Sequence, residues 1–360
     1  MATQRSLFIE RLYQEMEMEM LENIGRVIGE GLDITDDEIV QWQVAKLAQL
    51  GTLRKEQLKV LAKHADMTVG QMKEYIHDQG YAEVEAFDGR MKSLIDAGVD
   101  YVPPSNTVYE RLLALENQSA DVMNMINSNM ISGSDQIYRD IITKTSSTVL
   151  TGQKTPYQAA RDTIKEWSRS GIPVLTDKAG RQWSTEGYVS MVIRNTQKNT
   201  ALEMQNARMD EYDIDLLEIS SHAGSRPSHI PFQGRIYSRS GNSKKYPALS
   251  TTTYGEIDGI LTGIGCTHKG YPYVEGIHTK RHEPFNKKES VEKYENSQKQ
   301  RYLEREIRRA KKEKTALEAM GAAEEDIRDV NRKIRQKQAN MRSFIDDTGR
   351  TRRRQREQIV

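Results

Sequence analysis

Apolar side chains recur at helical spacing through the first part of the chain. Between residues 6 and 28 they lie three to five positions apart, which predicts an amphipathic helix. Thr35 is followed three residues later by Glu38, and Thr68 in the same way by Gln71. This spacing is the capping-box signal, so we predict that a helix begins just after each of these threonines.

A break and a second helical stretch follow. The two adjacent prolines in DYVPPSNTVYE remove backbone donors and predict an end to the helical pattern. The pattern resumes from about residue 107 to 149, and we expect an interruption near the sequence SGSD. Thr155 and Pro156 then predict the start of another helix, because proline is favoured at the first helical position.

Short β-rich runs alternate with loops between residues 171 and 282. The segment IPVLTDKAGRQWST predicts a β-hairpin around an Asp-Lys-Ala-Gly turn, and a helix is expected from about 185 to 212. IDLLEISS, GRIYS and YPYVEGI are the next strand candidates. Because Gly, Pro, Tyr and Thr are frequent around them, we expect an irregular, β-rich middle region.

The pattern changes again after Asn286, where two highly charged helices are predicted around the sequence Gly-Ala-Ala at 321–323. In the second of them, Ile327, Ile334 and Met341 repeat every seven residues, with Val330 and Phe344 at an offset of three. Such a repeat predicts a narrow apolar seam between antiparallel helices whose other faces are exposed to solvent.

Together these elements predict an α+β protein with three consecutive regions. They are a helical N-terminal half (1–150), an irregular Gly/Pro-rich middle domain that contains β-structure (151–286), and a charged antiparallel helical hairpin with a basic tail (287–360). Only 36% of residues are hydrophobic and 29% are charged, so the hydrophobic core must be small for a chain of this length. We expect neither a secretory signal nor a membrane span, and a single cysteine excludes an internal disulfide framework.

The net charge of +1 conceals an uneven distribution. From Lys287 onward there are 22 Lys and Arg against 14 Asp and Glu, and the chain ends in TRRRQREQIV. One interpretation is a solvated helical hairpin. The other is contact with phosphates or an acidic partner, for which the candidate nucleic-acid contacts are Arg352, Arg353, Arg354 and Arg356.

Side chains that could bind a metal or act in catalysis are concentrated in the middle region. SSHAGSRPSHIPFQG contains two histidines, and the only cysteine follows in GIGCTHKGYPY. The candidate motif comprises His222, Arg226, His229, Phe232, Gln233, Gly234, Cys266 and His268. We favour a polar staple, in which His, Arg and Gln side chains satisfy the unpaired backbone groups of the loops. On this interpretation no cofactor is needed and no residue is catalytic.

Two alternatives stay open. His222, His229, Cys266 and His268 offer the imidazole and thiolate ligands that zinc prefers, although their spacing differs from that of zinc fingers. A metal-dependent nuclease or toxin-like enzyme would instead use His222 or His229 as a base beside Asp258 or Glu256. The usual nucleotide-binding and hydrolase fingerprints do not occur in the sequence.

These same motifs carry a family resemblance. The run SSHAGSRPSHIPFQGRIYS, followed by YPALSTTTYGEIDGILTGIGCTHKGYPYVEGI, closely resembles the phage minor capsid protein 2 family. The upstream GRQWSTEGYVSMVIRNTQKNTALEMQN and the downstream QRYLEREIRRAKK and RSFIDDTGRTRRRQRE are also similar to that family. Phe232 stands where the family usually has Trp, and Ser225 where Ala is common. The Cys266 run lacks the arginine expected beside the cysteine, which weakens any role in binding an anion.

The resemblance implies a non-enzymatic structural protein of the virion, assembled in the host cytoplasm and placed in the head near the portal vertex. Its implied partners are the portal protein and capsid components, with packaged DNA contacted through the C-terminal tail and no membrane involved. The helical region 1–150 is the expected docking surface. Roles in head morphogenesis, DNA packaging and DNA ejection belong to the same expectation.

Overall fold

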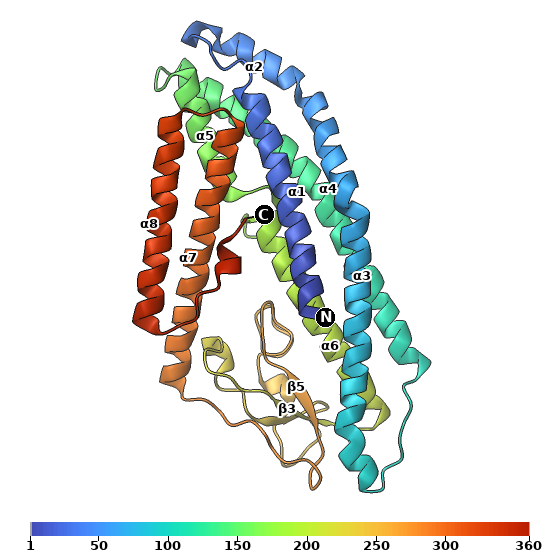
Figure 1. Cartoon of the computed structure of the whole chain (residues 1–360). Helices are drawn as coiled ribbons and strands as arrows, with labels where there is room; N and C mark the ends of the chain where they lie inside the picture. Colours follow the sequence, from blue (N-terminus) through green and yellow to red (C-terminus); the bar gives the residue numbers. More distant parts are fainter. Residues whose placement is uncertain (1, 360) are drawn as a thin grey trace. The chain divides into compact units, whose positions relative to one another are not determined.

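The computed structural model describes residues 2–359 and shows an α+β protein, mostly helical. The α-helices are α1 (Ala2–Gly29), α2 (Ile39–Ala48), α3 (Leu50–Asp96), α4 (Asn106–Leu150), α5 (Pro156–Ser170), α6 (Thr185–Glu211), α7 (Lys287–Ala319) and α8 (Glu324–Thr348) (Figure 1). The strands are β1 (Pro173–Thr176), β2 (Gln182–Ser184), β3 (Leu216–Ile219), β4 (Ile236–Ser238) and β5 (Gly270–Tyr273). Short 3₁₀ helices are η1 (Asp36–Glu38), η2 (Pro227–His229), η3 (Leu249–Thr251) and η4 (Arg354–Glu357).

The described residues form two compact units, each assembled from three separate stretches of chain. The sheet unit contains the residues up to Ser6, Gly70–Asp121 and Met191–Lys299. The helical unit contains Leu7–Val69, Val122–Ser190 and the residues from Gln300 onward. The three consecutive regions expected from the sequence therefore do not coincide with these units. Long helices such as α3 and α4 contribute residues to both, and a boundary inside a helix leaves no signal in composition.

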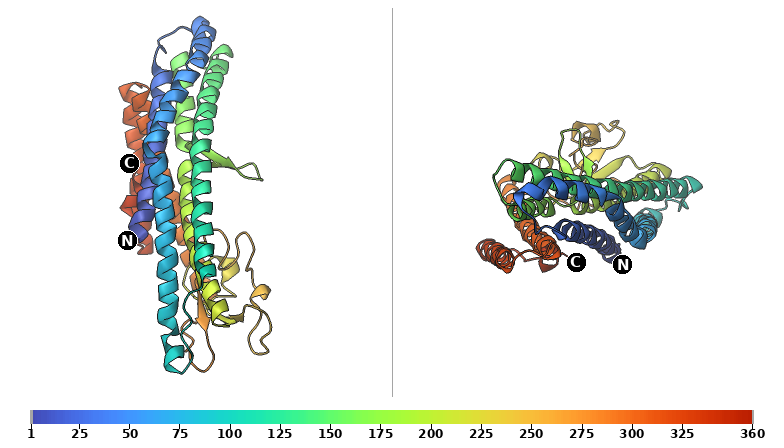
Figure 2. Two further views of the ribbon diagram at one scale, coloured as in Figure 1. Left: turned by 90° about the vertical axis from the view of Figure 1, so that its right-hand side faces the viewer. Right: turned by 90° about the horizontal axis from the view of Figure 1, so that it is seen from above.

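Several local predictions are confirmed. Thr35 and Glu38 form the expected capping box, with the Thr35 N–H donating to the Glu38 carboxylate at 2.8 Å. Thr155 caps α5, and Pro156 occupies its first position. β1 and β2 pair in an antiparallel hairpin, which extends away from the neighbouring helices of the helical unit (Figure 2). The carboxylate of Asp177 closes this turn by accepting the N–H groups of Ala179 and Arg181.

Two predicted breaks within the long helices are wrong. No helix begins at Thr68, because α3 passes through it and its hydroxyl donates to the Ala65 carbonyl of the preceding turn at 2.8 Å. Likewise α4 is continuous through the sequence SGSD. Gly133 lies there because a Cβ atom would come within 2.2 Å of the Pro173 carbonyl oxygen, so β1 packs directly against the helix backbone. Packing, rather than a helix break, therefore explains this glycine.

The helical unit includes a charged helical hairpin, formed by α8 and the later part of α7. α8 runs antiparallel to the later part of α7 (Figure 1), and Met341 packs with Leu303 and Ile307 in a narrow apolar seam. Predicted seam residues Ile327 and Ile334 are only half-buried. The seam is therefore as thin as the sequence predicted.

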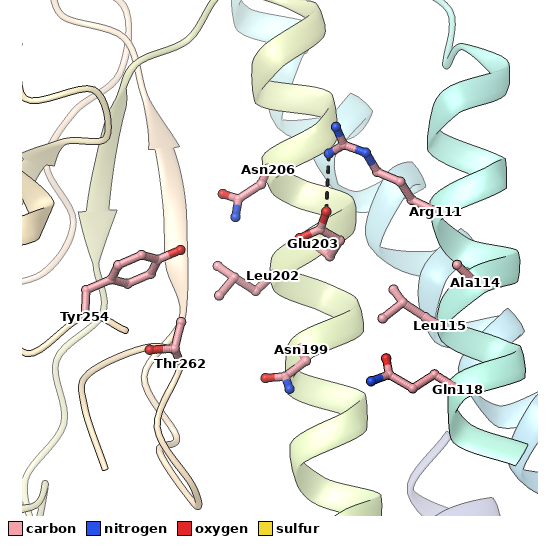
Figure 3. Close-up of a pocket in the computed structure, with 10 residues that line it drawn as sticks. All are labelled: Arg111, Ala114, Leu115, Gln118, Asn199, Leu202, Glu203, Asn206, Tyr254 and Thr262. Carbon is pink, nitrogen blue, oxygen red and sulfur yellow. Dashed lines mark hydrogen bonds and ion pairs between the residues drawn. The ribbon is translucent and has the colours of Figure 1, made fainter. Parts of the chain in front are cut away.

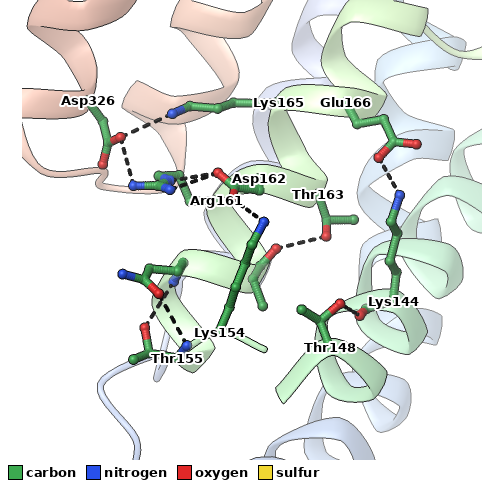
Figure 4. A network of polar contacts seen from close by, with 12 residues as sticks. Lys144, Thr148, Lys154, Thr155, Arg161, Asp162, Thr163, Lys165, Glu166 and Asp326 are labelled. Atoms are coloured by element: carbon green, nitrogen blue, oxygen red, sulfur yellow. Dashed lines mark hydrogen bonds and ion pairs between the residues drawn. The ribbon is translucent and has the colours of Figure 1, made fainter. Parts of the chain in front are cut away.

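At the other end of α8, Asp326 lies in the first helical turn and joins the helix to α5. It accepts from Arg161 at 3.2 Å and from Lys165 at 3.1 Å (Figure 4). It also accepts from the Tyr157 hydroxyl at 2.8 Å. Burial would raise the pKa of this carboxyl, but these donors lower it. A carboxylate is also favoured at a helix N-terminus by the helix dipole, so the connection suits the position.

The sheet unit contains a three-stranded antiparallel sheet in the order β4-β3-β5. Its core combines strand residues with α3 and α6, and Cys266 belongs to this cluster. The buried guanidinium of Arg208 lies over the ring of Tyr212 and donates to Asp88 at 2.6 Å and to the Val102 carbonyl at 2.7 Å. These bonds connect α6 to α3 and to the loop that follows α3.

Candidate functional site

Three side chains of the predicted motif converge in the sheet unit. One ring nitrogen of His229, one of His268 and the sulfur of Cys266 all lie within 4.8 Å of one another. His229 ends η2, whereas Cys266 and His268 immediately precede β5. All three side chains are buried, with at most 8% of the residue exposed. Residues 37 positions apart thus form one cluster of soft and borderline ligands.

Hydrogen bonds fix the tautomers of both histidines. Nε2 of His229 lies 2.8 Å from the Asp258 carbonyl oxygen, which can only accept. Nε2 of His268 lies 3.1 Å from Oε1 of Gln233. Both Nε2 atoms must therefore carry hydrogen, so that in the neutral rings each Nδ1 presents a lone pair. Sγ of Cys266 lies 3.8 Å from Nδ1 of His229 and 3.5 Å from Nδ1 of His268.

Gln233 is buried and positions two members of the motif. Its Oε1 atom accepts the backbone N–H of His222 at 3.0 Å as well as the ring N–H of His268, which identifies this atom as oxygen. His222 itself does not join the cluster of ligand atoms. Its ring stacks on that of His268 with centroids 4.5 Å apart, and its Nε2 atom bonds the Thr267 hydroxyl at 2.9 Å. Of the four residues proposed for zinc, the structure brings together three.

Arg226 binds the loop that precedes Cys266. Its guanidinium donates to the carbonyl oxygen of Asp258 at 2.7 Å and to that of Ile264 at 2.9 Å. The Asp258 carbonyl thus accepts from both Arg226 and His229, while its carboxylate is 63% exposed. The imidazole of His229 is consequently bonded to a backbone carbonyl and not to a carboxylate, unlike the His–Asp pair considered for a nuclease.

Burial lowers the pKa of both clustered histidines. For His268, burial acts together with the neighbouring His222 and His229 and lowers the pKa to about 3. For His229, burial is again the main cause of the lowered pKa. The hydrogen bond to the Asp258 carbonyl raises the pKa, whereas the charge of Arg226 lowers it further. Both rings are therefore neutral at physiological pH, which is the form that binds metals.

Two residues of α6 that the sequence analysis did not single out hold the same loop. Lys198 donates to the Thr262 carbonyl at 2.8 Å and also to that of Gly263, while Asn195 accepts the Gly265 N–H at 3.0 Å. Burial lowers the pKa of Lys198. Because Asn195 and Lys198 are three residues apart on a helix, they share a face, but no local motif marks them as loop ligands.

The remaining motif residues serve the packing. Phe232 lies half-buried against the core of the sheet unit. Gly234 has a φ of +67°, and a Cβ atom there would come within 2.6 Å of the backbone between Glu283 and Pro284. Glycine is required at this position for both reasons.

The four tail arginines fall into different environments. Arg352 forms a bidentate pair with Glu357, and Arg353 donates to Glu304 at 2.9 Å. The backbone carbonyl of Arg356 accepts from the Arg308 guanidinium. Arg354 is exposed. Two of the four proposed nucleic-acid contacts therefore have carboxylate partners within the protein.

A cavity of about 470 Å³ lies between α4, α6 and the loop after η3 in the sheet unit. Arg111 and Glu203 pair across it at 3.3 Å, and Tyr254 and Thr262 face them from the loop (Figure 3). Its lining consists of this ion pair, amides and apolar side chains, with neither histidine nor cysteine among them. It offers a polar recess without an evident acid, base or nucleophile pair.

Comparisons with known proteins place these observations in context. Residues 5–346 match the family described as phage minor capsid protein 2. The chain is 29% identical over 328 residues to a structural protein of Lactococcus phage LL-H, which covers 88% of this chain and 87% of that protein. It is 35% identical over 103 residues to a structural protein of Lactococcus phage mv4, covering 29% of this chain and 82% of that protein. No solved structure matches significantly. Among the described helices, none is both long enough and apolar enough to cross a membrane.

Proposed function

The chain belongs to the phage minor capsid protein 2 family, and from this we propose that it is a minor structural protein of a phage head, built into the virion beside the portal vertex. The family match across residues 5–346 carries the proposal. The relative in phage LL-H, a structural protein similar over most of both chains, supports it. The portal protein is the proposed partner, with other capsid components around it.

The proposed role requires no catalysis. Nε2 of His229 and Nε2 of His268 are already used as donors within the protein, and Cys266 is buried among core residues. A general base needs a nitrogen within reach of substrate, which neither ring provides in this arrangement. The cluster is better suited to stabilising its own loops than to acting on a bound molecule.

An exposed apolar face on α2 supports docking through the N-terminal region. Val40, Val44 and Leu47 are 51%, 64% and 40% exposed. Their spacing of four and three residues places them along one side of the helix. Ile39 and Trp42 are buried on the other side. We propose that this face, called here the α2 stripe (Val40, Val44 and Leu47), contacts the portal protein.

Co-purification of the full chain with the portal protein of the same phage tests this proposal. Replacing all three stripe residues by Gln should weaken the association by about tenfold or more, because apolar anchors carry most of the binding free energy. Ala45→Gln with Ala48→Gln is the matched control, since both positions are exposed on the same helix. Equal capture of both variants and the unaltered chain would refute docking through this stripe.

We also propose that the C-terminal region lies close to packaged DNA. The excess of Lys and Arg over Asp and Glu from Lys287 onward should create a positive electrostatic potential that attracts phosphate groups. The exposed Arg354 is the candidate for direct phosphate contact, because Arg352 and Arg353 are paired internally. No groove-reading motif is present in the sequence, so binding would depend on charge and not on base sequence.

A further inference from the structure

We propose that His229, Cys266 and His268 bind one Zn²⁺ ion through Nδ1, Sγ and Nδ1. Nothing in the family assignment requires this site, and it does not depend on the portal proposal. The ion would join the η2 loop to the segment before β5. Its role would be structural, holding together two loops of a unit that has little regular sheet.

The number of hydrogen-bond donors within the cluster favours a bound cation. Both Nδ1 atoms face the Cys266 sulfur as lone pairs, because each Nε2 atom already donates elsewhere. A single S–H group can donate to only one of them. Without a cation, the other imidazole would keep a buried acceptor unsatisfied, which is unfavourable. A metal ion bound by all three atoms removes this conflict.

The distances match zinc coordination. With Zn–S of about 2.3 Å and Zn–N of about 2.0–2.1 Å, tetrahedral geometry separates sulfur from nitrogen by about 3.6 Å. The two observed separations from Cys266 Sγ are 3.5 Å to His268 Nδ1 and 3.8 Å to His229 Nδ1. Both sulfur–nitrogen separations are therefore close to those around a bound zinc ion.

The surroundings also resemble those of a metal centre. Ligating histidines usually donate their second ring N–H to a carbonyl or another fixed acceptor, which orients the ring. Here the Asp258 carbonyl serves His229, and the Gln233 side-chain oxygen serves His268. Two neutral imidazoles and one thiolate form a ligand set that suits Zn²⁺ and not the oxygen-seeking Mg²⁺ or Ca²⁺. His222 is not a ligand, since its Nε2 atom bonds Thr267.

Metal content of the purified full chain tests the site. The protein is purified without a histidine tag or chelator, incubated with ZnCl₂, desalted and measured by elemental analysis. We expect about one zinc per chain, and a loss of most of it in Cys266→Ser and in His229→Ala. His222→Ala and His278→Ala are the matched controls. Each removes an imidazole of the same unit that is not a proposed ligand, so both variants should keep the ion.

Cobalt substitution keeps the test decisive if a variant is less stable. The Co²⁺ form should show tetrahedral absorption bands in the visible and a thiolate charge-transfer band in the near ultraviolet. Cys266→Ser should lose the charge-transfer band while circular dichroism shows a folded chain. The proposal is overturned if the unaltered chain binds no zinc, if copper or iron takes its place, or if both ligand variants keep zinc. Loss of zinc in His222→Ala would also overturn the three-ligand assignment.

Discussion

The ammonium group of Lys312 lies 2.6 Å from a carboxylate oxygen of Glu17, although 295 residues separate them in the chain. Both side chains are buried, at 6% and 0% exposure. Lys312 also pairs with Glu186 at 3.1 Å, and the other oxygen of Glu17 accepts the Ile172 N–H at 2.9 Å. Burial would lower the pKa of Lys312, but the two carboxylates raise it on balance. A single ammonium thus connects α7 to α1 and α6 within the helical unit.

Lys312→Met should therefore lower the free energy of unfolding by about 3–5 kcal/mol, because it leaves the buried Glu17 carboxylate and the partly buried Glu186 carboxylate without this counter-charge. Urea unfolding at neutral pH measures the change. Lys314→Met is the control on the same helix, since Lys314 pairs with Glu318 at an exposed position and should cost no more than about 0.5 kcal/mol. Similar losses in the two variants would contradict the importance of burial.

Acid should weaken the helical unit through Glu186. Burial alone would raise the pKa of this carboxyl, but Lys312 and Arg308 lower it from 4.5 to about 2. The unfolded chain thus binds more protons between these two values, so the stabilisation is present above about pH 4.5 and is lost as the pH falls towards 2. Unfolding free energies measured across this range should decline less steeply in Glu186→Gln. Glu318→Gln, altered at an exposed pair, should leave the steepness unchanged.

The loop contacts of Arg226 can be tested by truncation. Arg226→Ala leaves the carbonyls of Asp258 and Ile264 without this donor and should destabilise the protein by about 1–3 kcal/mol. His229→Ala should cost a similar amount, because it removes the second donor to Asp258. Thermal and urea unfolding measure both. Arg235→Ala, at an exposed position nearby, should have little effect, and an equally small effect of Arg226→Ala would refute the staple interpretation.

DNA binding by the tail predicts a particular salt dependence. Arg354→Gln should weaken binding to duplex DNA of any sequence and reduce the slope of log affinity against log salt by up to about one, the value for a lost phosphate contact. Fluorescence anisotropy at several salt concentrations measures the slope. Lys178→Gln in the β1–β2 turn is an exposed control of equal charge change. An unchanged slope for Arg354→Gln would mean that this side chain is only solvated.

The sequence by itself determined the local structure of this protein. Thr35 with Glu38, Thr155 with Pro156, and the turn closed by Asp177 all behave as predicted, because their partners lie within a few residues. The strands β3, β4 and β5 and the two charged C-terminal helices are likewise where the pattern of apolar residues indicated. The family could also be identified from ordered motifs of this kind.

Only the tertiary structure decided where helices continue and which distant side chains meet. The capping pattern at Thr68 lies inside α3, because a hydroxyl can bond the preceding turn as readily as it can cap a helix. Four residues seemed equal candidates for zinc, yet hydrogen bonds to Gln233 and Asp258 orient two imidazoles towards Cys266 while His222 bonds Thr267. Such pairings depend on how the loops pack. The local sequence around each residue does not indicate which distant residues it will contact.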